Sequence, residues 1–307
     1  MDRRQFFVFS SAALAATALR DIGVAAQQPA APAAAAPPLF ASVRRRVGTF
    51  TLRGGTIGYL INKDAVVVVD TQYADSAPTC VTGLKERSLN RTIDLVINTH
   101  HHADHTGGNG VFKEASTKIV AHSRVPELMK MVAASQPNAA APVLPGATFD
   151  STWSERMGDE TVTARHYGPG HTGGDAVVFF ERANVVHMGD LLFHEIHPRV
   201  DRQGGASIQN WMKSLDSIAR EHDSDTRFIA GHARPGAAVV QDKAALLQLR
   251  RYFDAALTHV RRGISEKKSK EEIVSLQALP GFEAYQSLGT VLTLGGLLTA
   301  AYEELTL

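Results

Sequence analysis

Between residues 43 and 69 the chain consists mainly of short runs of β-branched and aromatic residues, separated by turn-forming residues. Such runs occupy 47–52, 56–61 and 65–69. Glycines at 54 and 55 and the Asn62-Lys63-Asp64 segment separate them. Apolar runs bounded by turn residues predict β-strands connected by tight turns. We therefore expect three consecutive strands here.

Between residues 76 and 132, the positions of the apolar residues alternate between a helical pattern and a strand pattern. Helical spacing occurs at 76–89 and 125–132, whereas continuous apolar runs occur at 93–97 and 118–121. Continuous runs of this length are typical of strands buried on both faces of a sheet. This stretch therefore predicts alternating helices and strands, followed by a loop rich in proline and alanine at 136–145.

The second half repeats the mixture of elements. Four more short β-rich runs are at 161–167, 176–181, 184–188 and 227–230, and helical spacing covers 207–221 and the stretch from Leu246 to Val260. Ser269 and Glu272 have the spacing of a capping box that begins another helix. Because both halves mix strands with helices, we expect an α/β fold with two mixed sheets packed face to face and external helices, a four-layer αββα sandwich.

The N-terminus has the layout of an export signal. Arg3 and Arg4 precede Phe6, an apolar run continues to Leu19, and small residues end the stretch at Ala26. This pattern predicts a twin-arginine signal peptide over 1–26, an Ala/Pro-rich linker over 27–42 and a folded domain over 43–307. We expect export by the twin-arginine machinery to the periplasm or the medium. The apolar run is too short for comfortable membrane spanning, which disfavours the alternative of a membrane anchor or an uncleaved tail.

Charge and cysteine content narrow the functional classes. The formal net charge is +1, and the predicted leader accounts for this excess, so a nucleic-acid-binding surface is not expected. Cys80 is the single cysteine, which excludes an internal disulfide. We interpret Cys80 as a small buried helix residue.

The segment 98–109 contains the densest group of potential metal ligands. His100, His102, Asp104 and His105 follow the predicted strand at 93–97. Imidazole nitrogens and carboxylate oxygens bind Zn²⁺ at about 2.0–2.2 Å. Alternate positions at a strand end can direct two rings at one ion, so this segment predicts a metal site.

Three isolated residues share a second pattern. His171, Asp190 and His232 each follow a glycine near the end of a predicted strand. One such residue alone is weak evidence, since turn and capping residues have the same setting. Together with the cluster they complete seven ligands for two ions. By contrast, five other histidines lie within predicted elements and are interpreted as structural: His122, His166, His187, His222 and His259.

The order H-x-H-x-D-H, then a separate His, Asp and His, resembles the metallo-β-lactamase superfamily from about Val43 onward. The resemblance implies an αββα sandwich with a binuclear site at one edge. It assigns the first metal to His100, His102 and His171, the second to Asp104, His105 and His232, and a bridging position to Asp190. The positions of His101 and Ala103 vary in this pattern, so neither is expected to bind metal.

This pattern indicates a metal-dependent hydrolase of a small-molecule ester, thioester, lactone or amide. Two divalent cations about 3.5–4 Å apart can share a hydroxide that attacks a carbonyl group. Zinc is the expected metal, although iron and manganese accept the same ligands. Asp104 is the expected catalytic carboxylate, which orients the nucleophile or passes a proton to the leaving group.

Two alternatives remain beside this interpretation. One is a zinc β-lactamase, although enzymes of that kind place cysteine or serine where Asp190 stands. The other is a non-catalytic metal-binding accessory protein, which seven ligands disfavour because structural zinc sites use four. Substrate contacts are expected in the loop after Asp190, at Phe193, His194, Ile196, His197 and Arg199, and in the loop at 136–145.

Overall fold

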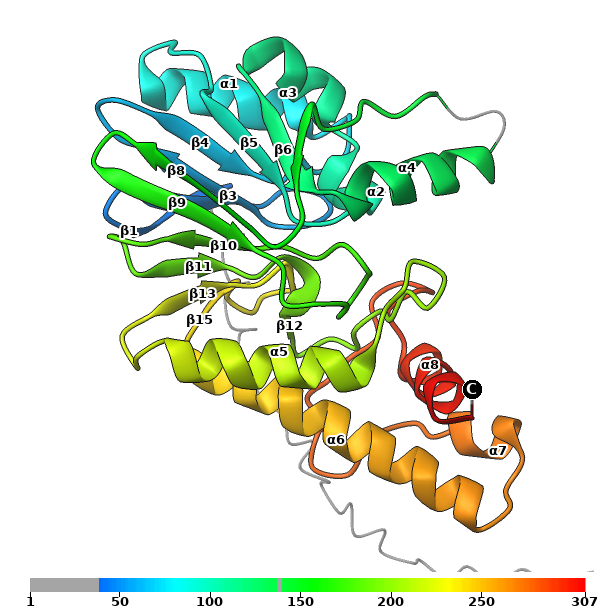
Figure 1. Cartoon of the computed structure of the whole chain (residues 1–307). Helices are drawn as coiled ribbons and strands as arrows, with labels where there is room; N and C mark the ends of the chain where they lie inside the picture. The colour runs from blue at the N-terminus through cyan, green and yellow to red at the C-terminus, as the bar shows by residue number, and fades with distance from the viewer. Residues whose placement is uncertain (1–38, 137–139, 307) are drawn as a thin grey trace, which may run out of the picture. The chain divides into compact units, whose positions relative to one another are not determined.

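The computed structural model describes residues 39–136 and 140–306, and two β-sheets form its centre (Figure 1). The first sheet has seven strands in sequence order. They are β1 (Phe40–Arg44), β2 (Val47–Phe50), β3 (Ile57–Ile61), β4 (Val66–Val69), β5 (Leu95–Asn98), β6 (Ile119–His122) and β7 (Ala147–Phe149). Strands β1 to β4 pair antiparallel, and β4 to β7 pair parallel.

The second sheet has six strands in the order β15-β13-β11-β10-β9-β8. They are β8 (Thr152–Met157), β9 (Glu160–Arg165), β10 (Val177–Phe180), β11 (Val185–His187), β13 (Arg227–Ile229) and β15 (Val240–Gln241). Strands β11 and β13 pair parallel. A separate two-stranded pair joins β12 (Phe193–His194) to β14 (His232–Ala233).

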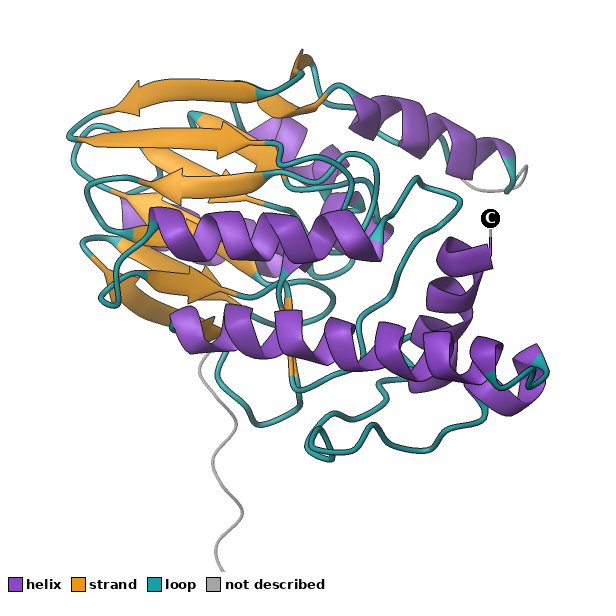
Figure 2. Ribbon diagram, turned by 60° about the horizontal axis from the view of Figure 1, so that its bottom comes forward, coloured by secondary structure: helices purple, strands orange, loops and turns teal. Residues whose placement is uncertain are grey.

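Helices lie outside the two sheets (Figure 2). On the side of the first sheet they are α1 (Ala77–Ser88), α2 (Ala103–Thr106), α3 (Asn109–Ala115) and α4 (Arg124–Ala134). On the other side are α5 (Ile208–Glu221), α6 (Lys243–Ser265), α7 (Lys270–Val274) and α8 (Leu294–Thr306). No helix in the described part of the chain is both long enough and apolar enough to span a bilayer.

Alternation along β4 shows how the layers form. Val67 and Val69 belong to the cluster between the two sheets, whereas Val66 and Val68 pack in the cluster that includes Leu84 of α1. Successive side chains of a strand point to opposite faces, so one strand with valine at every position buries both faces. The expected four-layer αββα sandwich is confirmed.

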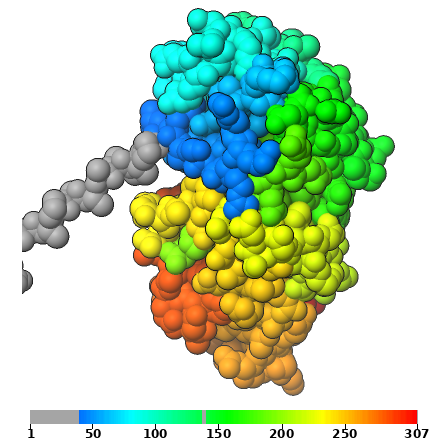
Figure 3. Space-filling view, turned by 90° about the vertical axis from the view of Figure 1, so that its left-hand side faces the viewer, coloured from blue at the N-terminus to red at the C-terminus, as the bar shows by residue number. Residues whose placement is uncertain are grey.

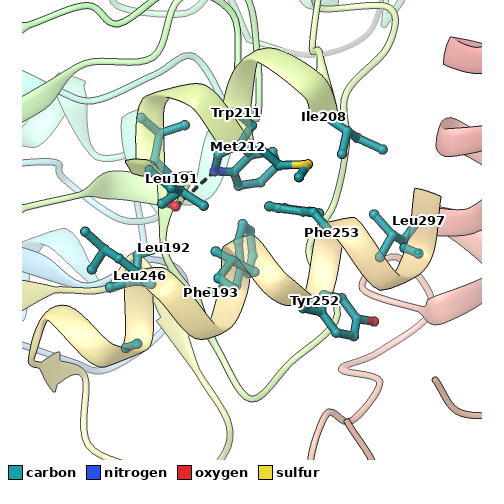
Figure 4. Close-up of a cluster of buried hydrophobic side chains, with 14 of the residues drawn as sticks. Leu191, Leu192, Phe193, Ile208, Trp211, Met212, Leu246, Tyr252, Phe253 and Leu297 are labelled. Atoms are coloured by element: carbon teal, nitrogen blue, oxygen red, sulfur yellow. Dashed lines mark hydrogen bonds between the residues drawn. The ribbon is translucent and has the colours of Figure 1, made fainter. Parts of the chain in front are cut away.

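The largest cluster lies between the second sheet and helices α5, α6 and α8. Trp211 of α5 is fully buried there beside Phe253, and its indole Nε1–H donates to the backbone oxygen of Leu191 at 3.0 Å (Figure 4). Leu191 directly follows Asp190 in the short 3₁₀ helix Gly189–Leu191. The core therefore holds the backbone next to a predicted metal ligand.

A surface contact also joins the two halves. Arg44 of β1 donates to both carboxylate oxygens of Asp225, at 2.9 and 3.2 Å. Figure 3 shows the early strands in blue adjoining the yellow residues of the second half on this face.

Several elements differ from the sequence predictions. Strand β1 begins at Phe40, before the expected domain start at residue 43, so the end of the expected linker is part of the first sheet. Strand β8 was not predicted, because it alternates exposed and partly buried residues and lacks an apolar run. Helix α8 was not predicted either. The predicted leader and the linker up to residue 38 lie outside the described residues.

Local predictions elsewhere agree with the structure. The capping box of Ser269 and Glu272 is confirmed at the start of α7, with both reciprocal hydrogen bonds present. Cys80 is buried in α1, as expected for a small residue in the core.

Candidate metal centre

The seven predicted metal ligands leave the ends of strands at one edge of the sandwich. His100, His102, Asp104 and His105 follow β5, and His171 precedes β10. Asp190 follows β11 and His232 follows β13. Because β11 and β13 are parallel, their carboxyl ends lie at the same edge, and the structure brings all seven side chains together there.

Four of these side chains form a first group of donors. One ligand atom from each of His100, His102, His171 and Asp190 lies within 4.8 Å of all the others. Nδ1 of His102 lies 3.1 Å from Nε2 of His100 and 2.9 Å from Nε2 of His171. Oδ2 of Asp190 lies 3.3 Å from Nε2 of His171.

The second group consists of Asp104, His105 and His232. Nε2 of His232 lies 3.0 Å from Oδ2 of Asp104. Oδ1 of Asp190 lies 3.0 Å from Nε2 of His105 and 3.4 Å from Nε2 of His232. Asp190 thus directs one oxygen to each group and occupies the position between them.

Asp70 holds two histidine rings by their Nδ1 atoms, directly for His105 and through Thr99 for His100. Its Oδ2 accepts hydrogen bonds from Nδ1–H of His105 at 2.7 Å and from the Thr99 hydroxyl at 2.8 Å. Oγ1 of Thr99 in turn lies 3.0 Å from Nδ1 of His100. With Nδ1 engaged, the Nε2 atoms of both rings face the donor groups. A carboxylate behind a metal-binding histidine sets its tautomer and orientation.

Asp201 has the corresponding role for His102. Nε2–H of His102 donates to Oδ2 of Asp201 at 2.9 Å, which leaves Nδ1 facing the first group. Nε2 of His101 lies 3.3 Å from the same oxygen. His101, His102 and Asp201 therefore form a third compact cluster, although only His102 also faces the other ligands.

This arrangement fits divalent cations. One ring nitrogen from each histidine of the first group points towards the other two. The second nitrogen of each of these rings, which points away, already makes a hydrogen bond. Oδ1 of Asp190 is buried and has no hydrogen-bond partner among residues 39–136 and 140–306. Converging lone pairs and an unpaired buried carboxylate oxygen are costly unless a cation offsets them.

The electrostatics favour bound positive charge. Burial raises the pKa of Asp190, but the imidazoles of His232 and His105 outweigh burial and hold it well below its usual value. Burial lowers the pKa of His232, yet Asp190 and Asp104 together raise it to about 9. The second group thus attracts a proton in the absence of metal, and a cation competes with that proton.

The structure corrects most of the expected substrate loop. Phe193 and Ile196 lie in the hydrophobic core, where Phe193 stacks against His232 with ring centroids 5.5 Å apart. His197 is buried and bonds to the Tyr252 hydroxyl at 2.6 Å. A cavity lined by His102 and Asp104 lies beside the metal centre. His194 is half-buried in β12 and does not line this cavity. Apolar residues that follow a buried strand pack into the core rather than line a pocket. Arg199 is the one residue of this group that lines the cavity.

Sequence reasoning missed two carboxylates. Asp70 follows a run of four valines and has φ of +67°, and Asp201 stands near Gly204 and Gly205. A charged residue at the end of a fully apolar strand is a recognisable signal for Asp70. Nothing local connects Asp201 with His102, because their contact depends on the fold.

Comparison with known proteins identifies the family to which this chain is similar. The sequence model described as the metallo-beta-lactamase superfamily matches residues 51–232. A metallo-beta-lactamase type 2 of Elizabethkingia meningoseptica is 24% identical over 174 residues, which cover 57% of this chain and 67% of the relative. A hydroxyacylglutathione hydrolase of Rhodospirillum rubrum is 32% identical over 147 residues, covering 47% of this chain and 50% of the relative.

Solved structures share the fold. The DIM-1 metallo-beta-lactamase aligns with a TM-score of 0.59 at 18% identity, over 71% of this chain and 97% of the other. The stereoselective inverting sec-alkylsulfatase Pisa1 from Pseudomonas sp. aligns with a TM-score of 0.68 at 14% identity, over 87% of this chain and 50% of the other.

Proposed function

Because the chain belongs to the metallo-β-lactamase superfamily and is thereby a metal-dependent hydrolase, we propose that it is an exported enzyme with two divalent cations, zinc first, that cleaves esters, thioesters, lactones or amides. One observation carries this proposal. Two adjoining groups of buried or partly buried donors share Asp190, which directs one oxygen to each.

We assign one cation to each donor group. His100, His102 and His171 would hold the first cation, Asp104, His105 and His232 the second, and Asp190 both. When bound, a pair of such cations supplies an acidified water and a polarising charge for the carbonyl oxygen. Iron or manganese would suit the same nitrogen and oxygen donors.

The residues of the chain prepare the site before substrate arrives. Asp70 and Asp201 hold His105 and His102 by their outer nitrogens, so that these rings keep one tautomer and one orientation. Rigid placement of this kind reduces the reorganisation needed during the reaction.

Asp104 is the proposed catalytic carboxylate. Burial raises its pKa, but the neighbouring His105 and a hydrogen bond from His232 hold it below its usual value, so it is ionised at neutral pH. Its side chain retains 22% exposure and lines the cavity beside the metal centre. We assign to Asp104 the orientation of the attacking water and the transfer of its proton towards the leaving group.

A zinc β-lactamase is the second candidate, because several similar relatives are named metallo-beta-lactamases. The carboxylate of Asp190 argues against it, since the resemblance places cysteine or serine at that position in zinc β-lactamases. Cleavage of a chromogenic cephalosporin, lost in Asp104→Ala and after chelation, would promote this candidate over the first.

Export is part of the proposal and rests on the leader at 1–26. Expression of the full chain followed by cell fractionation tests it. Substitution of Arg3 and Arg4 by lysine is expected to retain the protein in the cytoplasm, and unchanged export would reject the twin-arginine route.

A hydrolysis screen on metal-quantified protein tests the enzyme. We expect about two equivalents of metal per chain and turnover of at least one carbonyl substrate class, with His102→Ala as the inactive reference. One tightly bound ion without turnover would instead favour a metal-binding accessory protein.

A further inference from the structure

A cavity of about 500 Å³ opens beside the metal centre. His102 and Asp104 line one end of it. Its other described walls include Tyr73, residues of α2 and the start of α3, the end of α4, residues 140–143 and Arg199. A space of this size accommodates a small organic molecule, and its contact with two metal ligands makes it the place for substrate.

Arg199 brings a positive charge to the metal end of this cavity. Its backbone oxygen accepts the hydrogen bond from Nδ1 of His171 at 2.7 Å, which anchors the residue next to the first donor group. The side chain is exposed and has no carboxylate partner among the described residues. By contrast, the neighbouring Arg202 is paired with Glu304 and Arg234 with Glu195.

The Arg199 guanidinium and the two proposed cations would repel one another, although water screens part of this repulsion because the side chain is exposed. An anionic group on a bound molecule removes this cost, because it satisfies the planar N–H donors of the guanidinium and offsets the local positive charge. The position of Arg199 therefore indicates an anion close to the bond that is cleaved.

Another part of the cavity lining is apolar. Met129, Val132 and Ala133 of α4 line it together with Pro142 and Val143. Val132 is 38% exposed, although α4 buries Val125, Leu128 and Met129 against the core. An exposed valine in a concave wall gains stability when an apolar group covers it.

We propose that the substrate is an anionic amphiphile: a carboxylate or similar anion near the scissile bond binds Arg199, and an apolar tail lies against Val132 of α4. The inference rests on the proposed hydrolase function and defines its substrate class. In the reaction, water adds to the carbonyl carbon, the bond to the leaving group breaks, and the leaving group departs with the proton.

Two pairs of matched thioesters test the charge and the tail. S-octanoyl mercaptoacetate carries a carboxylate next to the thiol, and S-octanoyl mercaptoacetamide replaces it by a neutral amide of similar shape. The S-acetyl analogues of both lack the apolar tail. Thiol release is measured on metal-quantified full-length protein.

We expect kcat/KM for the octanoyl carboxylate to exceed that for the amide by about tenfold to a hundredfold, as for a charge-assisted hydrogen bond. Arg199→Met is expected to bring this ratio close to one. Arg220→Met, at an exposed arginine of α5 away from the cavity, is the matched control and should retain the ratio. A ratio that is near one in the wild type, or unchanged in Arg199→Met, would overturn the proposed anion site.

The tail has its own matched pair of variants. Val132→Asn is expected to reduce the preference for octanoyl over acetyl by about threefold to tenfold. Met131→Asn changes an exposed neighbour on the same helix that does not line the cavity, so it should leave this preference intact. Equal effects of both variants would reject the apolar wall as the binding surface.

Binding without turnover separates the two proposals. S-octyl mercaptoacetate is a thioether that cannot be hydrolysed, and its affinity for the metal-loaded protein is measured by calorimetry against S-octyl mercaptoacetamide. A preference for the carboxylate that depends on Arg199 supports the anion site even if no thioester is cleaved. Turnover of all four thioesters without any preference supports the hydrolase and rejects the substrate class.

Discussion

The carboxylate of Asp201 and the imidazole of His102 are 99 positions apart in the sequence, yet Nε2 of His102 lies 2.9 Å from Oδ2 of Asp201. Oδ1 of Asp201 accepts a further hydrogen bond from the backbone N–H of Gly204 at 3.0 Å, which fixes the carboxylate in its loop. The orientation of one candidate metal ligand is thus set by a loop of the opposite half of the chain.

Asp201→Asn is expected to weaken cation binding about tenfold to a hundredfold, as is typical when a carboxylate behind a histidine ligand is removed. Competition with a metal-binding dye measures this affinity, and nitrogen NMR of the His102 ring should show loss of the single Nε2–H tautomer. Asp216→Asn, which removes a surface partner of Arg250, is the control and should change neither reading. Unaltered affinity in Asp201→Asn would contradict a positioning role.

Gly55→Ala is expected to displace His105. A methyl group at Gly55 would overlap the imidazole of His105, and the hydrogen bond to Asp70 prevents that ring from moving back. Extensive dialysis followed by elemental analysis should find the metal content falling from about two equivalents towards one. Gly146→Ala is the matched control, because a methyl group there meets no atom of the described part of the chain within 4 Å. Full retention of both cations in Gly55→Ala would contradict the predicted displacement of His105.

Trp211→Phe is expected to lower the free energy of unfolding by about 1–3 kcal/mol, because the buried oxygen of Leu191 loses its hydrogen-bond donor. Urea denaturation followed by circular dichroism measures this loss. Trp153→Phe, at a partly buried position of β8, is the control for the removal of an indole ring and should change stability less. Equal losses in the two variants would argue against a special role for the bond to Leu191.

His122 is expected to make the fold sensitive to acid. Burial, followed by the imidazole of His166 stacked at 4.0 Å, lowers the pKa of His122 to about 4. Nε2–H of His122 donates to the backbone oxygen of Asp150, and its Nδ1 accepts from the backbone N–H of Arg124. Protonation would abolish the second bond and place a charge beside His166 and the Arg124 side chain.

The direction in which pH changes the folding stability follows from the pKa of His122 in the folded and unfolded chain. The unfolded chain binds the proton near pH 6.5 and the folded chain only near pH 4, so the stability is complete above pH 6.5 and declines as pH falls towards 4. His122→Asn should therefore lose about 1–2 kcal/mol less than the wild type between pH 7 and pH 4.5. Parallel pH dependence of the two proteins in urea denaturation would reject this assignment.

The amino-acid sequence by itself determined the layers and the ligand types. Valines at consecutive positions of β4 required burial on both faces, and His100 and His102 stand two positions apart at the end of a strand. Such patterns are short-range, because strand and helix periods act over a few residues. Neighbouring residues along the chain therefore suffice to specify them.

Only the tertiary structure decided which distant groups meet. The parallel pairing of β11 with β13 placed Asp190 beside His232, and the loop after β12 brought Asp201 to His102 and Arg199 to the cavity. Phe193 of β12 and Ile196 just after it lie in the core, although their sequence setting resembled a substrate pocket. Sheet register and loop burial depend on the packing of the whole domain, so no local pattern specifies these contacts.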